Sequence, residues 1–413
     1  MVQLLYTNEK GDLFESSALA MAAQRGSESI HPGEETLMTL PAGATLTAMP
    51  GRRPLGFDQS GNLVPLKRGN VWPVAALLPQ GFTRTLLPAY EREGDPEILP
   101  LFGYTAVGMS NGKVLVAAVQ TDDHKTWHPN HYNTPELPKL IQKMRKRFPE
   151  NRLVTHLGHC SLEYGCFTAQ NIFYHRWEGG LPVSPQCNAN CLGCISLQTA
   201  ECCPSPQGRI RFKPSAREVG ELGAYHLKAN GAPIISFGQG CEGEPSMAAD
   251  TLAESIAWMR RETLGGTINI NTNGGYFRGI KKIVDSGLDA MRVSILSAVE
   301  PNYAAYYRTS QYSLVDVEKS LQYGVGKGIV VSLNLLALPG FTDRESEIEA
   351  LLQMVRRTGL QMVQIRNLNI DSDFFYRSMG IAPEKSLGME VLIQALMKDN
   401  VAVGNYSRPK NPI

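Results

Sequence analysis

The residues with the clearest chemical potential in this sequence are three cysteines on one short segment. Cys187, Cys191 and Cys194 lie in PVSPQCNANCLGCISLQ, separated by three residues and then by two. Three thiolates on one tight loop can converge on one face of a cubane iron–sulfur cluster, each binding one iron. The fourth iron would stay open to an exogenous ligand, as the metal does in catalytic zinc sites. A zinc ion would instead need a fourth protein ligand.

The other cysteines lie close to these three in the sequence. All eight fall between residues 160 and 241 of the 413-residue chain, a clustering that favours metal binding over scattered core thiols. A second iron–sulfur cluster would have to use Cys160, Cys166 and the Cys202–Cys203 pair. Adjacent side chains diverge, so buried or substrate-relay thiols are the competing interpretation for these residues and for Cys241.

Composition and termini narrow the classes of protein. The chain has 40 basic and 39 acidic residues, so its net charge of +1 gives no reason to expect nucleic acid or an anionic membrane as partner. The start, MVQLLYTNEKGDLFE, lacks the pattern of a secretory signal, and no stretch of about 18 apolar residues predicts a membrane span. We therefore expect a cytoplasmic protein with reduced thiols.

Two regions precede the cysteine segment. Residues 1–133 predict a small β-rich domain, because turn sequences such as Asn111-Gly112, 9–12 and 58–62 separate short strand-like runs. Residues 134–181 predict a helical or irregular connector that begins with a helix over 134–148. The basic end of that helix is typical of a helix C-terminus, where cations are favoured.

From residue 182 the pattern alternates between strands and helices. A capping box formed by Ser215 and Glu218 predicts the start of one helix, which stops before Gly231. Six βα units over 182–370 predict a parallel sheet or barrel with its ligand site at the carboxyl ends of the strands, followed by a C-terminal helix and tail over 371–413. The predicted strands are 182–185, 233–240, 267–273, 291–297, 330–340 and 362–370, and the predicted helices include 246–263, 276–286, 313–323 and 343–358.

The cysteine triplet and its position after the first strand resemble the CxxxCxxC motif of the radical SAM superfamily. The resemblance implies an α/β fold, a partial (β/α)6 barrel that here follows the β-rich domain. It also implies a 4Fe-4S cluster that reductively cleaves S-adenosylmethionine to methionine and a 5′-deoxyadenosyl radical. Many members carry an aromatic residue where this chain has Gly193, so Ile195 is expected to contact the adenine instead.

The resemblance extends to residues after the later strands. Gly243, Glu244 and Pro245 match the GGE-P segment that holds the methionyl amino group, while Glu242 replaces its first glycine. Glycine allows close approach of the backbone, and a carboxylate pairs with an ammonium group. Further expected contacts to S-adenosylmethionine are Asn273, Ser294, Arg308 and Asn334.

Three further predictions concern side chains near this rim. Cys241 is a candidate hydrogen donor, because it would lie near the radical. Arg366, Asn367 and Asn369 after the last predicted strand are expected to contact cofactor or substrate. A divalent ion could bind at a polar concentration that contains Asp122, Asp123, His124, His128 and His131 and is joined by His156 and His159, although solvated histidines are the simpler interpretation.

The leading hypothesis is an oxidoreductase-type radical SAM enzyme that works anaerobically and abstracts hydrogen from an unidentified substrate. A peptide or protein substrate would suit the β-rich domain, which is placed to cap the barrel. Its partners would be S-adenosylmethionine and a reductant such as flavodoxin or ferredoxin. The rival hypothesis is a non-catalytic iron–sulfur electron-transfer protein or a zinc-stabilised binding protein.

Overall fold

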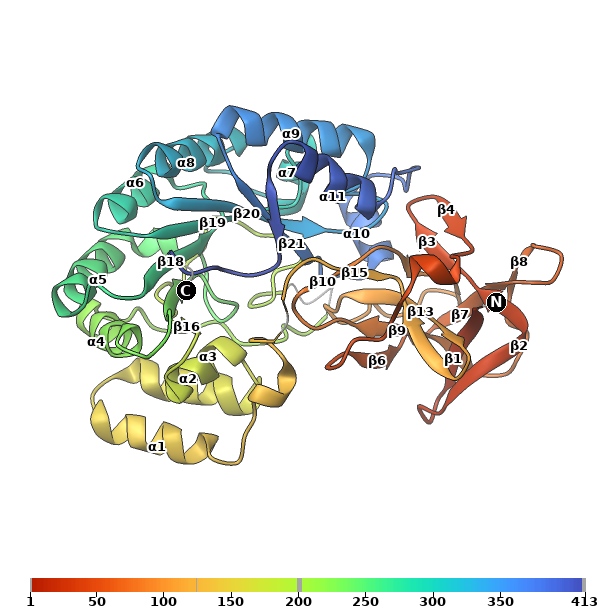
Figure 1. Ribbon diagram of the computed structural model, residues 1–413, viewed down its shortest axis with the longest axis horizontal. Coiled ribbons are helices and arrows are strands. Elements are labelled where there is room, and N and C mark those ends of the chain that lie inside the picture. Colours follow the sequence, from red (N-terminus) through yellow and green to blue (C-terminus); the bar gives the residue numbers. More distant parts are fainter. Residues whose placement is uncertain (1, 124, 199–202, 411–413) are drawn as a thin grey trace.

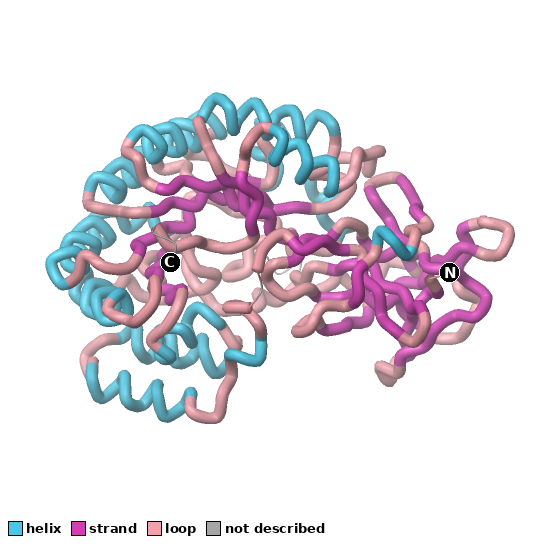
Figure 2. The backbone as a smooth tube through the Cα atoms, viewed as in Figure 1, coloured by secondary structure: helices cyan, strands magenta, loops and turns pink. Residues whose placement is uncertain are grey.

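The computed structural model describes residues 2–123, 125–198 and 203–410, so His124 and Cys202 lie outside the described residues. Its larger part is a curved parallel sheet with helices on the outer side (Figures 1 and 2). Each described strand of this sheet pairs in parallel with the next along the chain. In sheet order the strands are β16 (Glu178–Gly180), β17 (Ile234–Phe237), β18 (Thr267–Thr272), β19 (Ala290–Ile295), β20 (Val330–Ala337), β21 (Met362–Asn367) and β22 (Ala402–Gly404).

Helices connect these strands and cover the convex face of the sheet (Figure 1). Parallel strands need such crossovers, and the helices bury their apolar faces against the sheet. A 3-10 turn, η3 (Pro245–Ala248), precedes α5. The helices of this part are α4 (Ala216–Leu227), α5 (Ala249–Glu262), α6 (Phe277–Asp285), α7 (Glu300–Tyr307), α8 (Leu314–Gly326), α9 (Glu345–Thr358), α10 (Ser372–Met379) and α11 (Met389–Lys398).

The structure confirms the predicted α/β partial barrel and five of the six predicted strands, β17 to β21. The prediction of a first strand at 182–185 is wrong, since this segment has no strand conformation. Its two prolines lack the backbone N–H that a sheet ladder requires. The first strand is β16, whose sequence Glu-Gly-Gly has no apolar residue to signal it. Its glycines admit a neighbouring helix, because a Cβ at Gly179 would come within 2.4 Å of Ile172 Cδ1.

The amino-terminal part consists of antiparallel strands, as predicted. Asn111 and Gly112, with φ of 50° and 71°, form the hairpin turn between β13 and β14. The strands are β1 (Gln3–Asn8), β2 (Leu13–Met21), β3 (Ala23–Arg25), β4 (Glu28–Ile30), β5 (Met38–Thr39), β6 (Thr45–Ala48), β7 (Arg52–Phe57), β8 (Leu63–Pro65), β9 (Val71–Leu77), β10 (Phe82–Arg84), β11 (Leu87–Pro88), β12 (Tyr90–Arg92), β13 (Tyr104–Ser110), β14 (Lys113–Val116) and β15 (Ala118–Gln120), with a 3-10 turn η1 (Glu34–Thr36).

Three helices lie between this β-rich part and the barrel: α1 (Leu137–Arg147), α2 (Arg152–Glu163) and α3 (Phe167–Tyr174), after a 3-10 turn η2 (Pro129–His131). They pack beside β16 at one end of the parallel sheet (Figure 1). The predicted helix over 134–148 is confirmed as α1, whose last turn carries its basic residues. No helix in the described part of the chain is long and apolar enough to span a membrane.

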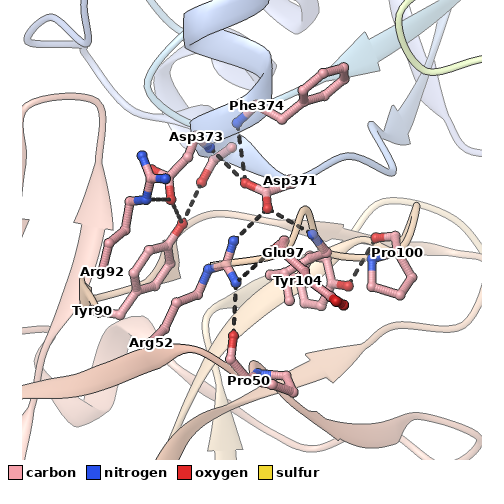
Figure 3. A network of polar contacts seen from close by, with 12 residues as sticks. Pro50, Arg52, Tyr90, Arg92, Glu97, Pro100, Tyr104, Asp371, Asp373 and Phe374 are labelled. Atoms are coloured by element: carbon pink, nitrogen blue, oxygen red, sulfur yellow. Dashed lines mark hydrogen bonds and ion pairs between the residues drawn. The ribbon is translucent and has the colours of Figure 1, made fainter. Parts of the chain in front are cut away.

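The β-rich part packs against the carboxyl ends of β20 and β21. The buried guanidinium of Arg84 donates to the carbonyl of Leu368 at 2.6 Å and to that of Ala337 at 3.3 Å. Arg52 forms a buried ion pair with Asp371, with 2.6 Å between Nη2 and Oδ2 (Figure 3). The β-rich part is therefore fixed at the rim of the barrel where strand ends meet.

The capping box of α4 provides a test of local stability. Ser215 and Glu218 cap each other as predicted, and Glu218 also pairs with Arg152 at 2.7 Å. The arginine hydrogen bond is the main reason why the pKa of Glu218 falls from its ordinary value of 4.5 to about 2. A lowered pKa stabilises the fold above the unfolded pKa, and this contribution is lost as pH falls towards the folded pKa.

We therefore expect Glu218→Gln to lower the free energy of unfolding by about 1–2 kcal/mol at pH 7. The difference between wild type and variant should shrink between pH 4.5 and about 2, as the wild-type carboxylate takes up its proton. Urea unfolding across this pH range measures the difference in the free energy of unfolding between the two proteins. A difference that stays constant down to the lowest pH would contradict the assignment.

Candidate active site

The three cysteines of the CxxxCxxC segment lie on one loop between β16 and α4. Two backbone hydrogen bonds hold this loop against the end of α7: Asn190 N–H to the carbonyl of Tyr307 at 2.9 Å and Leu192 N–H to that of Tyr306 at 3.1 Å. The three thiols are half-buried and form no disulfide. Burial raises the pKa of the Cys191 thiol, and the neighbouring thiols reinforce this, so a bound metal would be needed to hold Cys191 as a thiolate.

The cysteine loop forms one wall of a cavity of about 250 Å³ at the carboxyl ends of the strands. The loop after β17, the ends of β18 and β19 and the end of α7 form the other walls, the position expected of a ligand site in a parallel α/β fold. The predicted site residues that line the cavity are Cys187, Cys191, Cys194, Ile195, Gly243, Glu244, Pro245, Asn273 and Ser294.

Glu244 is a buried residue of the cavity lining and connects the loops after β17 and β18. Its carboxylate accepts hydrogen bonds from the Ser246 N–H at 3.0 Å, the Asn273 N–H at 2.8 Å and the Thr272 hydroxyl. Burial raises the pKa of Glu244, which these donors oppose by stabilising the charged form. An ammonium group in the cavity would also stabilise that charge.

Gly243 lies directly against the cysteine loop. Its N–H donates to the carbonyl of Ser184 at 2.7 Å, and the next N–H, that of Glu244, donates to the carbonyl of Gln186 at 2.8 Å. A Cβ at Gly243 would meet the Gln186 carbonyl oxygen at 2.1 Å. Only glycine therefore allows this approach of the two backbones.

Glu242, which stands where the family's segment has a glycine, is a buried scaffold residue. Its Oε2 accepts from the N–H groups of Val183 and Ser184, and its Oε1 from those of Gly238 and Gln239, at 2.6–3.1 Å. Burial raises its pKa to about 7, against the effect of these four donors. In the sequence motif, Glu242 is only a departure from the family's first glycine. In the structure, its carboxylate joins the loops after β16 and β17.

Tyr306 accounts for the glycine at position 193. A Cβ at Gly193 would lie 2.7 Å from the Tyr306 hydroxyl oxygen, so the tyrosine ring occupies the space beside this glycine. Tyr306 and Tyr307 both line the cavity. No motif in the sequence indicates either tyrosine as a site residue. Ile195 lines the cavity as well.

Three other residues predicted to contact S-adenosylmethionine are Asn334, Asn273 and Arg308. Asn334 donates to the Ser294 hydroxyl at 3.0 Å, so it orients a residue of the cavity wall without itself forming part of that wall. Asn273 donates to Asn188 at 2.7 Å and connects the end of β18 to the cysteine loop. Arg308 is exposed at the end of α7 with φ of 50°, and the structure does not place it in the cavity wall.

Several polar residues predicted to face the site have other partners. Asn367 accepts from the Arg84 N–H at 3.0 Å and donates to the Phe82 carbonyl at 3.0 Å. Arg366 donates to the Asn405 carbonyl at 2.8 Å and to the Gln80 side chain at 3.1 Å. These contacts to the β-rich part and the tail correct the expectation that Arg366 and Asn367 bind ligand.

The predicted metal-binding histidine loop gains no support among its described members. The His128 ring accepts the Asn130 N–H at 3.2 Å and so caps η2. His131 packs edge-on against Trp177, with 5.2 Å between ring centroids. His124, the third member, lies outside the described residues.

The structure also places Cys241 differently from the prediction. Its side chain is 3% exposed and lies beside Cys160 and His156, and Cys241 is not among the residues of the cavity wall, although Gly240 and Glu242 are. A hydrogen-donor role for its thiol therefore receives no support. The second iron–sulfur cluster suggested for Cys160, Cys166 and the Cys202–Cys203 pair also receives no support. Among the described residues, Cys160 instead lies beside Cys241 and His156.

The residues around the cavity fit an iron–sulfur cluster with a polar ligand beside it. Arg209 donates to Cys194 Sγ at 3.6 Å and so places a guanidinium charge beside one of the three sulfurs. Within the described part of the chain, Asn271 Nδ2 and Gln239 Nε2 line this region as buried donors without hydrogen-bond partners. Buried polar atoms without partners at a cavity indicate a ligand with matching groups.

The parallel barrel, the three free thiols at its strand ends and the buried carboxylate beside them form a site in an α/β barrel that is suited to a metal cluster. Residues 181–355 match the model of the Radical SAM superfamily, so the chain contains a radical SAM domain. Its cofactors are accordingly a 4Fe-4S cluster and S-adenosylmethionine. No curated protein sequence matches the chain.

Several solved structures resemble this chain at low sequence identity. A tagged form of anSMEcpe with bound AdoMet is 13% identical with a TM-score of 0.40, and the match covers 55% of this chain and 61% of that one. A radical SAM methyltransferase from Sphaerobacter thermophilus is 14% identical with a TM-score of 0.40, covering 56% and 67%. Streptococcus suis SuiB bound to S-adenosylmethionine is 12% identical with a TM-score of 0.38, covering 65% and 62%. The identification rests on the family match and the site, because these TM-scores are below 0.5.

Glu244→Gln is expected to weaken the binding of S-adenosylmethionine by about 10- to 100-fold, because the amide loses the charge and one acceptor oxygen. The iron content should not change, since no cysteine is affected. Equilibrium dialysis of the reconstituted protein with labelled S-adenosylmethionine measures the affinity. Glu262→Gln, at an exposed glutamate on α5 that pairs with Lys228, is the matched control. A loss of iron in Glu244→Gln that matches its loss of affinity would show a structural role instead.

Proposed function

We propose that the protein abstracts a hydrogen atom from a carbon of a peptide or protein substrate. The observation that carries the radical chemistry is the single cavity that brings Cys187, Cys191 and Cys194 beside Glu244. When bound by these cysteines, the cluster would supply the electron that cleaves S-adenosylmethionine to methionine and a 5′-deoxyadenosyl radical. The electron would come from a reductant such as flavodoxin or ferredoxin, and the substrate hydrogen would end on the 5′ carbon.

The chain's own residues would bind and orient the co-substrate. Glu244 is placed to pair with the methionyl ammonium group, and Gly243 allows the backbone to approach it. Ser294, held by Asn334, and Asn273, held by Asn188, offer polar groups to the carboxylate and ribose. The buried side chains around these groups would limit the access of water, which would protect a reactive intermediate from side reactions.

The size of the cavity and the position of the β-rich part favour a large substrate that inserts only its reacting group. A volume of about 250 Å³ lies at or below the lower end of ligand pockets and leaves little room beside the co-substrate. The β-rich part is fixed at the strand ends of β20 and β21 by Arg84 and Arg52. It can therefore contact the remainder of a peptide or protein at the rim.

Anaerobic reconstitution, followed by dithionite and S-adenosylmethionine, tests the first step. We expect methionine and 5′-deoxyadenosine in equal amounts, whereas an electron-transfer or zinc-binding protein would form neither. The substrate class is tested with perdeuterated cell extract separated by size into peptide, protein and small-molecule pools. Deuterium in 5′-deoxyadenosine should arise from the peptide or protein pool. Transfer from the small-molecule pool alone would overturn the proposed substrate class and leave the radical chemistry intact.

A further inference from the structure

A second group of side chains of the types that bind metals lies next to the loop that lines the candidate active site. His156 and Cys160 are four residues apart on α2, so both face the same side of that helix. Cys241 comes from the loop between β17 and η3. The ligand atoms of the three side chains all lie within 4.8 Å of one another, and His156 Nε2 is 3.6 Å from Cys160 Sγ.

These distances are close to those of a metal site. Zinc binds sulfur at about 2.3 Å and imidazole nitrogen at about 2.0–2.1 Å, so tetrahedral coordination places ligand atoms roughly 3.3–3.8 Å apart. The His156–Cys160 pair already has this separation. The remaining distances require shifts of about 1 Å or less, which side-chain rotation can supply.

Burial and charge favour a divalent ion at this position. Cys160 is 0% exposed and Cys241 3% exposed, whereas His156 is half-buried and gives access from the surface of α2. Two thiolates and a neutral imidazole carry a charge of −2, which a divalent cation balances. The loaded site would therefore be neutral, and a buried neutral site avoids the cost of an uncompensated buried charge.

We propose that His156, Cys160 and Cys241 bind a zinc ion, separate from the cluster of Cys187, Cys191 and Cys194, with water as the fourth ligand. Two sulfurs and one nitrogen are a typical zinc donor set. A second cubane is disfavoured, because the group contains only two cysteines among the described residues. The nearby Cys166 contacts the Thr168 hydroxyl at 3.4 Å instead of joining the group.

The ion would connect α2 to the loop that carries the site's acidic residues. Cys241 is followed directly by Glu242, whose carboxylate joins the loops after β16 and β17, and the Cys241 carbonyl accepts the Ile210 N–H at 2.7 Å. Zinc would hold this loop in place from behind. The effect of zinc on the position of the active-site loop rests on the proposed function, whereas the proposal that zinc binds does not.

The test measures zinc in the full-length protein. A Cys187→Ala/Cys191→Ala/Cys194→Ala background removes the competing thiolates, and zinc is added before exhaustive dialysis. Elemental analysis should give about one zinc per chain, and His156→Ala, Cys160→Ala or Cys241→Ala should each lower the retained zinc at least about tenfold. His159→Ala is the matched control, since this histidine lies on the same helix and contacts the Tyr164 hydroxyl instead.

Cobalt substitution gives a second measurement that does not depend on activity. Thiolate–cobalt charge-transfer absorption should appear in the background protein that lacks Cys187, Cys191 and Cys194. It should disappear when Cys160→Ala is added to that background. His156→Gln keeps the test valid if a buried cysteine variant fails to fold, because His156 is only half-buried. Zinc below about 0.2 per chain in the background protein, or equal zinc in the His156 and His159 variants, would overturn the proposal. Either result would leave the cleavage of S-adenosylmethionine by the cluster-loaded protein untouched.

Discussion

Cys191→Ala is expected to abolish the cleavage of S-adenosylmethionine and to reduce bound iron from about four atoms per chain to less than about one. Two thiolates would not hold a cubane cluster for which three cysteines are the proposed ligands. Colorimetric iron assays and chromatographic detection of 5′-deoxyadenosine after anaerobic reconstitution measure the two effects. The fold should persist, because Cys191 is only half-buried and its loop is held through the backbone of neighbouring residues.

Cys166→Ala is the matched control for this variant. Cys166 is also half-buried and precedes α3, but it lies outside both the cysteine loop and the cavity wall. Its loss should leave iron and 5′-deoxyadenosine formation near the wild-type level. Four irons retained in Cys191→Ala, or lost in Cys166→Ala, would contradict the assignment of the cluster ligands.

Asp371→Ala is expected to lower the free energy of unfolding by about 3–5 kcal/mol, because it leaves the Arg52 guanidinium buried without its counter-charge. The Arg52 and Asp371 side chains, which point toward each other in Figure 3, are buried, with exposed fractions of 2% and 1%. Asp371 also accepts the Leu99 N–H at 2.9 Å and caps α10. Urea unfolding at pH 7 measures the loss.

Arg53, which follows Arg52 on β7, forms an exposed ion pair that can be compared with the pair broken by Asp371→Ala. Arg53 pairs with Glu93, but these side chains are 35% and 38% exposed, so Glu93→Ala should cost less than about 1 kcal/mol. Adding Arg52→Met to Asp371→Ala should recover part of the lost stability, since the unpaired charge is then removed. Equal effects of Asp371→Ala and Glu93→Ala would show that the buried pair does not stabilise the junction between the β-rich part and the barrel.

Features that depend on neighbouring residues could be predicted from the sequence. The capping box of Ser215 and Glu218, the hairpin at Asn111-Gly112 and the alternation of strands β17–β21 with helices all follow from local propensity and periodicity. The three-cysteine loop belongs to this class, because its ligands are close in the chain. Its position at the strand ends followed from the rule that parallel α/β folds bind ligands there.

Tertiary structure alone decided which polar side chains serve the site and which serve the framework. Arg366 and Asn367 contact the β-rich part, Glu242 binds four backbone N–H groups, and Cys241 meets α2 instead of the cavity. These choices rest on contacts between distant parts of the chain, as Arg52 and Asp371 are 319 residues apart. No local pattern encodes such pairings, because burial and partner are set by the packing of whole elements. The sequence by itself therefore determined the chemistry of the cysteine loop, and the packed fold determined its surroundings.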